Sequence, residues 1–288
     1  MALWQTARFD VDLSRPRVMG IVNVTPDSFS DGGRHADAAA ACAHCERLVA
    51  EGADLLDIGG ESTRPGAVTP SVDEELARVL PVVRHAVTLG VPVSVDTSAP
   101  EVMRAVLDAG ADVVNDVRAL TRPGALAAVA AHPRAGVCLM HMRGEPGTMQ
   151  QQAAYDDVVA EVVAFVDERA RALRARGIDA RRIVVDPGIG FAKSAAHNLE
   201  LLRRQRELLG AGYPLLVGWS RKSTLGAITG RPVGERLAAS LAAAVLAVER
   251  GAAIVRVHDV APTVDALKLW HAATAAGATP AAGGGTIT

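Results

Sequence analysis

The sequence predicts a single-domain (β/α)8 TIM barrel, an α/β fold, from three observations. Short runs rich in β-branched residues occur eight times along the 288 residues. Each run ends in polar or glycine residues, and a stretch with helical spacing follows it. Strict strand–helix alternation indicates a parallel sheet, and eight units suit a closed barrel of about 250 residues. An open, doubly wound sheet is the alternative, because periodicity alone does not show that a sheet closes.

The eight strands are justified in order by runs of Val, Ile and Leu. They are expected at 18–24, 54–58, 91–96, 112–116, 136–141, 182–186, 214–217 and 254–258. Helical spacing between them is clearest at 37–51, 73–89, 155–176 and 232–250. Several of these helices are followed by glycine, the residue that favours a left-handed helix terminus. The units are evenly spaced without a Pro/Ser linker, so we expect a lead-in at 1–17, one barrel at 18–276 and a flexible tail at 277–288.

Composition argues against nucleic acid and membrane partners. The formal net charge is -2, and 49% of the residues are hydrophobic, so no global charge points to a polyanion or a lipid surface. The longest apolar stretch, 237–248, is too short to span a bilayer and is expected to be a buried or interface helix. The first residues lack the features of a signal peptide. We therefore expect a cytoplasmic protein.

The pair Cys42 and Cys45 invites a metal or redox interpretation. Both cysteines share one helical face with Ala38 and Val49, and the chain has no second cysteine pair to complete a zinc site. We therefore interpret them as buried core residues.

The ends of the predicted strands carry the informative polar residues. In the last strand, alternation puts Ile254, Arg256 and His258 on one face, and a parallel barrel keeps its chemistry at the C-terminal ends of its strands. Strands 1 and 2 run into the long polar loops 23–33 and 59–66, which we interpret as mobile lids over the barrel mouth. Two ordinary solvated loops are the alternative.

Further polar groups follow strands 3, 4 and 6. Ser94 and Asp96 share a face, whereas Asn115 and Asp116 lie on opposite faces, so only one of these two can point inward. Asp186 ends strand 6. Helix capping could explain any one of them. Together at one rim they favour a pocket for a polar heterocycle.

Lysine is rare in this chain. Only Lys193, Lys222 and Lys268 occur, so 27 of the 30 Lys and Arg residues are arginine. A lysine where arginine is the rule indicates that a compact ammonium group is needed after strand 7, at Lys222. A surface lysine is the alternative.

Eight motifs, in order along the chain, resemble those of the dihydropteroate synthase family. They are 23–33 (NVTPDSFSDGG), 60–66 (GESTRPG), 94–97 (SVDT), 115–116 (ND), 140–142 (MHM), 186–188 (DPG), 220–223 (SRKS) and 256–259 (RVHD). Departures are small: Ile189 stands where Phe is frequent, and Ala192 where Gly is frequent. The match extends from about residue 18 to residue 275.

The resemblance implies the reaction of a transferase. The family joins p-aminobenzoate to 6-hydroxymethyl-7,8-dihydropterin pyrophosphate, which gives 7,8-dihydropteroate and pyrophosphate in folate biosynthesis. It also implies Mg2+ as cofactor, a homodimer formed by late helices, and inhibition by sulfonamides, which mimic p-aminobenzoate.

The same resemblance implies the roles of individual residues. Asp96, Lys222, Arg256 and His258 would be catalytic. The pterin would be bound by Asp96, Asn115, Met140, Asp186, Phe191, Gly218 and Lys222. Pyrophosphate would be bound by Asn23, Thr63, Arg64, Arg256 and His258, with Asn23 as the metal ligand. p-Aminobenzoate would be bound by Phe29, Pro65, Lys222 and Ser223.

Two other functions are compatible with a pterin-binding barrel. A methyltransferase that passes a methyl group to a corrinoid would share the Asp/Asn pterin contacts, but it has no use for an Arg/His pyrophosphate site. A catalytically silent pterin-binding paralogue would be expected to lose loop residues, and both loops are intact here.

Overall fold

The structure, a computed structural model, describes residues 3–25, 33–62 and 69–274. Its strands are β1 (Leu3–Gln5), β2 (Asp10–Asp12), β3 (Arg17–Asn23), β4 (Leu55–Gly59), β5 (Val93–Asp96), β6 (Val113–Asp116), β7 (Gly136–Met140), β8 (Ile183–Asp186), β9 (Leu216–Val217) and β10 (Ile254–Val257). Its α-helices are α1 (Gly33–Ala50), α2 (Val72–Ala86), α3 (Pro100–Asp108), α4 (Ala125–Ala131), α5 (Val158–Arg174), α6 (Ala195–Arg203), α7 (Gln205–Leu208), α8 (Ser223–Thr229), α9 (Leu237–Glu249) and α10 (Val260–Thr274).

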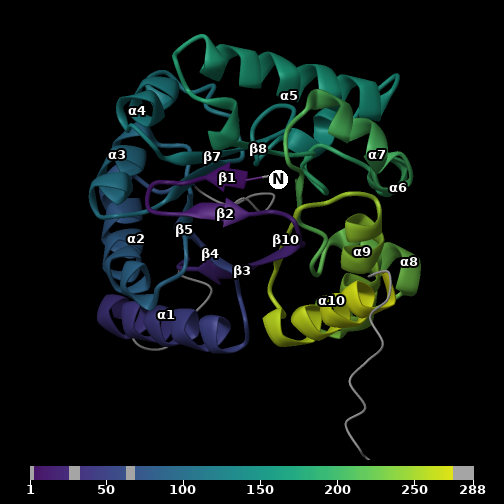
Figure 1. Cartoon of the computed structure of the whole chain (residues 1–288), viewed down its shortest axis with the longest axis horizontal. Helices are drawn as coiled ribbons and strands as arrows, with labels where there is room; N and C mark the ends of the chain where they lie inside the picture. Colours follow the sequence, from purple (N-terminus) through teal and green to yellow (C-terminus); the bar gives the residue numbers. More distant parts are fainter. Residues whose placement is uncertain (1–2, 26–32, 63–68, 275–288) are drawn as a thin grey trace, which may run out of the picture.

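Eight parallel strands form the predicted barrel, with helices around it (Figure 1). Strands β3 to β8 pair with their neighbours in chain order, and β10 pairs with both β3 and β9. A parallel bridge between Val185 and Leu215 joins β8 to the segment before β9 and closes the ring. The predicted barrel is confirmed, and the open sheet is excluded.

Local sequence signals set several helix starts. At α2, Ser71 and Glu74 form a capping box, in which each side chain bonds the other residue's backbone N–H. The Asp157 carboxylate accepts from two backbone N–H groups at the start of α5. Pro100 opens α3, where its missing N–H costs nothing. The helices predicted at 73–89 and 155–176 match α2 and α5 within three residues at each end, whereas the helix predicted at 232–250 begins only at Leu237, as α9.

Side chains alternate between the barrel interior and the layer under the helices. Met19, Leu55, Val113, Cys138 and Ile254 meet inside the barrel, whereas neighbours such as Val18, Val114 and Val255 belong to the outer core. In α1, Cys45 is buried, and Ala38, Cys42 and Val49 pack against the same core. The interpretation as a buried core residue is confirmed for Cys45, while Cys42 lies at the edge of the core and is only partly buried.

Residues 3–17 hold more structure than the expected lead-in. Strands β1 and β2 form an antiparallel hairpin across the N-terminal end of the barrel (Figure 1). Trp4 is fully buried among the interior residues, and its indole N–H donates to the Arg182 carbonyl at 2.9 Å. A buried tryptophan contributes strongly to stability, since its replacement by alanine typically lowers the free energy of unfolding by about 3–5 kcal/mol. The runs are too short for the strand pattern to be visible in the sequence.

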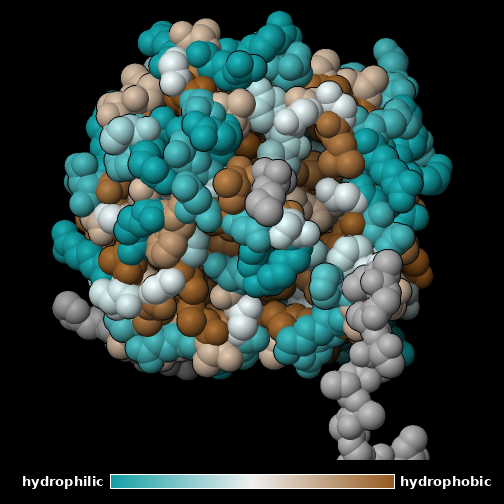
Figure 2. Space-filling model, viewed as in Figure 1, coloured by the Kyte–Doolittle hydropathy of each residue, from teal (hydrophilic) through white to brown (hydrophobic). Residues whose placement is uncertain are grey.

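Figure 2 shows this end of the molecule, where hydrophobic residues reach the surface among hydrophilic ones. Helix α9 has a buried face that includes Ala243, Ala244 and Ala247, whereas Leu246 is exposed on the opposite side. Leu237, the first residue of α9, is exposed as well. No helix in the described part of the chain is long and apolar enough to cross a membrane.

Candidate active site

Arg256 lies at the centre of a polar layer at the C-terminal mouth of the barrel. Its Nε donates to Asp57 Oδ2 at 2.6 Å, and its Nη2 donates to Asp96 Oδ2 at 3.3 Å. Asn115 Nδ2 donates to the same Asp57 oxygen at 3.1 Å. Strands β4, β5, β6 and β10 therefore each contribute one side chain to a single hydrogen-bonded group, as the predicted alternation requires.

Asp57 was not predicted as a site residue. It is fully buried in the middle of β4, and it holds both Arg256 and Asn115. Its other oxygen, Oδ1, has no partner among the described residues. A lone Asp inside an apolar run is the signal that could have revealed it, because burial of a carboxylate requires compensation.

Asn115 and Asp116 point to opposite sides, as alternation predicts. Asp116 accepts a hydrogen bond from Ser98 Oγ and others from the backbone N–H groups of Arg118 and Leu120. It therefore organises the β6–α4 loop and leaves Asn115 as the inward group.

Asp186 ends β8 and fixes the loop that follows. Its Oδ1 accepts from the Gly188 N–H at 2.7 Å. Burial raises the pKa of Asp186, while this hydrogen bond and the charges of Lys222 and Arg256 oppose the rise. Gly188 has φ +68°, and a Cβ there would lie 2.0 Å from the His141 carbonyl oxygen, so the position demands glycine.

Lys222 immediately precedes α8 and lies near Asp186, on the same side of the barrel as the polar layer. Its Nζ is 4.3 Å from the centre of the Phe191 ring, a cation–π distance. Burial lowers its pKa to about 8, although the charge of Asp186 raises it in part. Ser223 is the exposed first residue of α8.

His258 follows β10 and is oriented by Ser220, a second residue without a predicted role. The Ser220 hydroxyl lies 3.0 Å from His258 Nδ1 and accepts from the His258 backbone N–H at 3.2 Å. Burial, followed by the charges of Arg256 and Arg221, lowers the pKa of His258 to about 3. The imidazole is therefore neutral near pH 7. When Nδ1 accepts from the Ser220 hydroxyl, Nε2–H is available to a ligand.

The remaining predicted residues divide into two groups. Asn23 ends β3, Gly218 follows β9, and Met140 and Phe191 belong to one apolar cluster beside the polar layer. Phe29, Thr63, Arg64 and Pro65 lie outside the described residues. Loop lengths agree with prediction, because β3 ends at Asn23 and α1 begins at Gly33, while β4 ends at Gly59 and α2 begins at Val72.

Metal binding would depend on very few protein ligands. No group of three or more His, Cys, Asp or Glu residues in the described ranges could hold an ion. The Asn23 side chain makes no hydrogen bond to a described residue, so its amide oxygen is free to coordinate. One amide oxygen with substrate phosphate oxygens is a donor set that suits Mg2+.

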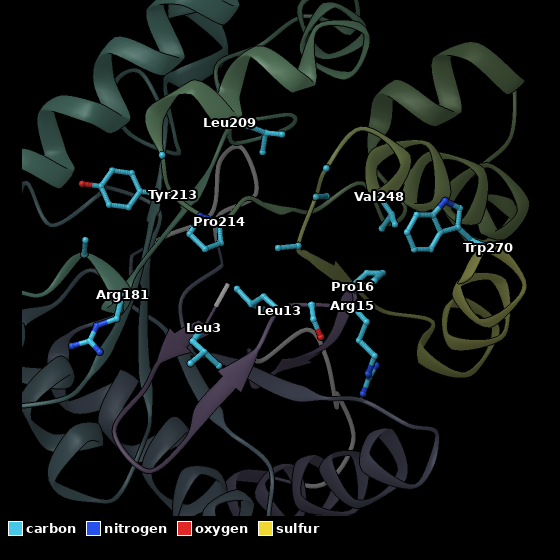
Figure 3. Close-up of a pocket in the computed structure, with 16 residues that line it drawn as sticks. Leu3, Leu13, Arg15, Pro16, Arg181, Leu209, Tyr213, Pro214, Val248 and Trp270 are labelled. Atoms are coloured by element: carbon cyan, nitrogen blue, oxygen red, sulfur yellow. The ribbon is translucent and has the colours of Figure 1, made fainter. Parts of the chain in front are cut away.

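A large pocket lies at the opposite end of the barrel (Figure 3). It has a volume of about 660 Å3, and Leu3, Leu13, Tyr213 and Trp270 are among its lining residues. Its arginines are already paired, Arg15 with Asp54 and Arg181 with Asp179. The polar layer, rather than this pocket, combines inward charges with shifted pKa values.

The whole chain resembles known enzymes with the same layout. Residues 19–258 match the family model described as pterin binding enzyme. The dihydropteroate synthase of Neisseria meningitidis serogroup B is 50% identical over 276 residues, which cover 94% of this chain and 97% of that protein. The chain belongs to the dihydropteroate synthase family.

Solved structures of dihydropteroate synthases share the fold. The Xanthomonas albilineans enzyme with 4-aminobenzoic acid is 54% identical, with a TM-score of 0.90 over 95% of this chain and 98% of that one. The Yersinia pestis enzyme in a sulfonamide complex is 46% identical, with a TM-score of 0.90 over 95% of this chain and 100% of that one. The chain is therefore a transferase of the dihydropteroate synthase type, and the corrinoid methyltransferase is disfavoured.

The acidity of Asp96 generates a prediction about stability. Burial raises its pKa from 3.8 to about 8, because this effect and the charges of Asp57 and Asp116 outweigh the attraction of Arg256. Between these two pH values the folded protein binds more protons at Asp96 than the unfolded chain does, so this group's stabilisation is lost as pH rises. We expect the Asp96→Asn variant not to lose this stabilisation as pH rises, because asparagine does not titrate.

Thermal unfolding of both proteins between about pH 5 and about pH 8 measures the effect. The Tm of the variant minus that of the wild type should increase with pH, whereas Asp265→Asn, at an exposed carboxylate of α10, should give a constant difference. A difference for Asp96→Asn that is flat or falls with pH contradicts the raised pKa.

Proposed function

We propose that the polar layer around Arg256 binds 6-hydroxymethyl-7,8-dihydropterin pyrophosphate and transfers its pterinylmethyl group to p-aminobenzoate. One observation carries the proposal: Asp96, Asn115, Asp186 and Arg256 project from four strands into one mouth, with Lys222 beside them. Membership in the dihydropteroate synthase family supplies the reaction. The assignment of roles to individual residues is our proposal.

The pterin ring needs donors and acceptors along one edge and apolar surfaces on its faces. Asp96, Asn115 and Asp186 supply the edge, and Lys222 reaches the ring carbonyl. Met140, Phe191 and Gly218 line the slot. The cation–π contact of Lys222 with Phe191 supports this assignment, since it brings the ammonium group to an apolar wall.

The leaving pyrophosphate needs positive charge and hydrogen-bond donors. Arg256 and neutral His258 face the mouth, and Asn23, Thr63 and Arg64 complete the proposed site. Asn23 would hold Mg2+ through its amide oxygen. When bound there, the ion would supply positive charge that stabilises the departing pyrophosphate.

Bond breaking runs ahead of bond making in this proposal. The electron-rich dihydropterin stabilises a cation at its exocyclic methylene, and the Asp96 carboxylate lowers the energy of that cation. Its raised pKa means that Asp96 must lose a proton before it can act in this way. The arylamine is neutral at pH 7, so attack needs no strong base in the protein.

The second substrate completes the site. Ser223 and Lys222 would bind the carboxylate of p-aminobenzoate, with Phe29 and Pro65 as apolar walls. Sulfonamides would occupy the same place. The complexes of the Xanthomonas and Yersinia enzymes support this proposal, since those relatives were solved with 4-aminobenzoic acid and with a sulfonamide.

A release assay tests the function. Pyrophosphate release with Mg2+ should be accompanied by dihydropteroate formation when p-aminobenzoate is present, and a sulfonamide should inhibit dihydropteroate formation. Pterin binding without any product would favour the catalytically silent paralogue. Methyl transfer to a corrinoid protein would favour the methyltransferase.

Arg256→Ala should separate the two parts of the pterin substrate. Binding of the pyrophosphate ester should weaken by about 10- to 100-fold, because a charge-assisted contact is lost, while binding of the bare pterin changes far less. Isothermal titration with each ligand measures both constants. Arg171→Ala, at an exposed arginine of α5, is the control. An equal loss for both ligands would place Arg256 elsewhere.

We also propose a homodimer that forms through α8, α9 and the turn between them. Ile228, Val233, Leu237 and Leu246 are large apolar residues that stand exposed on these neighbouring segments. Large apolar side chains that stand exposed in one region favour an interface.

Two further predictions remain proposals. They are the division of the chain into a barrel at 18–276 and a tail at 277–288, and a cytoplasmic location.

Leu246→Glu should disrupt the dimer, because it places a charge in the apolar interface. Light scattering at micromolar concentration should report two chains for the wild type and one chain, 29.9 kDa, for the variant. Leu209→Glu, at an exposed leucine outside α8 and α9, is the control. Two chains for both variants would contradict this interface.

A further inference from the structure

Lys193 is a buried lysine for which no role has been assigned so far. Its residue exposure is 4%, and it makes no ion pair with any carboxylate in the described ranges. Its ammonium donates to the Phe191 carbonyl at 3.0 Å and to the His141 carbonyl at 3.4 Å, and it lies 2.9 Å from His141 Nδ1. A buried ammonium is costly unless such acceptors surround it.

His141 presents the ring nitrogen Nδ1 to Lys193. Burial, followed by the charges of Lys193 and Arg143, lowers the pKa of His141 to about 2, so the ring is neutral. Burial also lowers the pKa of Lys193 to about 7. When Lys193 is charged it can only donate, so Nδ1 of His141 then accepts and Nε2 carries the proton. The ring packs against Phe165 in a T-shaped contact, with 4.9 Å between the ring centres.

These contacts join two walls of the proposed pterin slot. His141 directly follows Met140 at the end of β7, and Phe191 lies in the loop between β8 and α6. Met140 and Phe191 share one apolar cluster. Lys193 therefore bonds the backbone carbonyls of His141, next to Met140, and of Phe191, and so links the two walls.

The backbone between β8 and α6 needs this support. Ala192 has φ +49°, in the left-handed region that costs a non-glycine residue about 1–2 kcal/mol. The family's frequent glycine at this position has the same physical explanation. The hydrogen bonds from Lys193 to the Phe191 and His141 carbonyls hold the loop in this strained conformation.

We propose that Lys193 is a positioning residue, which sets the spacing between Phe191 and Met140 and thereby the fit of the pterin. The inference rests on the proposed pterin site. It does not place Lys193 in contact with substrate. An apolar residue could fill the same volume, but it could not bond two carbonyl groups and a ring nitrogen at once.

The test compares Lys193→Met, Lys193→Arg and the control Lys268→Met, which changes an exposed lysine of α10. Lys193→Met should weaken binding of the bare pterin by about 10- to 100-fold, as small displacements in a preorganised site do. The KM for p-aminobenzoate, measured at saturating pterin pyrophosphate, should change by less than about threefold. Lys193→Arg should recover much of the pterin affinity, since it retains the charge and donors.

A merely structural lysine would give a different result. In that case Lys193→Met would lower Tm while the folded protein kept its pterin dissociation constant, and the proposal would be wrong. If Lys193→Met does not fold, His141→Phe removes the ring acceptor and retains an aromatic shape. Unchanged pterin binding by that folded variant would overturn the proposal. Loss of binding in the wild type and in Lys268→Met would instead contradict the proposed pterin site.

Discussion

The ion pair between Arg256 and Asp57 determines the arrangement of the barrel mouth. Asp57 is fully buried, so its charge must be balanced by a neighbour, and Arg256 is the cation that reaches it. Once held there, the guanidinium also meets Asp96, and Asp57 also accepts from Asn115. Removal of one partner from a buried ion pair typically costs about 3–5 kcal/mol, because the other charge stays buried alone. The positions of two proposed pterin contacts, Asp96 and Asn115, and of the proposed pyrophosphate contact Arg256 thus depend on one carboxylate.

Much of this layout could be predicted from the sequence, because strand alternation is a strong constraint. It placed Arg256 and His258 on one face, and it placed Asn115 and Asp116 on opposite faces. The eight-unit pattern likewise predicted the barrel. Such inferences depend only on the backbone geometry of a strand, which is nearly the same in every protein.

Other features depend on contacts between distant segments, and no local pattern encodes them. The hairpin of residues 3–12 consists of two three-residue strands, which are too short to show periodicity. Ser220 and His141 obtain their roles from partners 38 and 52 residues away. Asp57 differs, because a single carboxylate between apolar residues of a strand does not by itself show which cation compensates its burial.

The hairpin beneath the barrel has a consequence for synthesis of the chain. Trp4 binds the carbonyl of Arg182, 178 residues later, and packs with Leu216 and Ile254 from the last two strands. At about 5–20 residues per second, a ribosome needs on the order of ten seconds or more to produce those partners. The Trp4 side chain therefore emerges long before the strands that cover it have been made. Closure of the barrel and burial of the β1–β2 hairpin must then come late in folding.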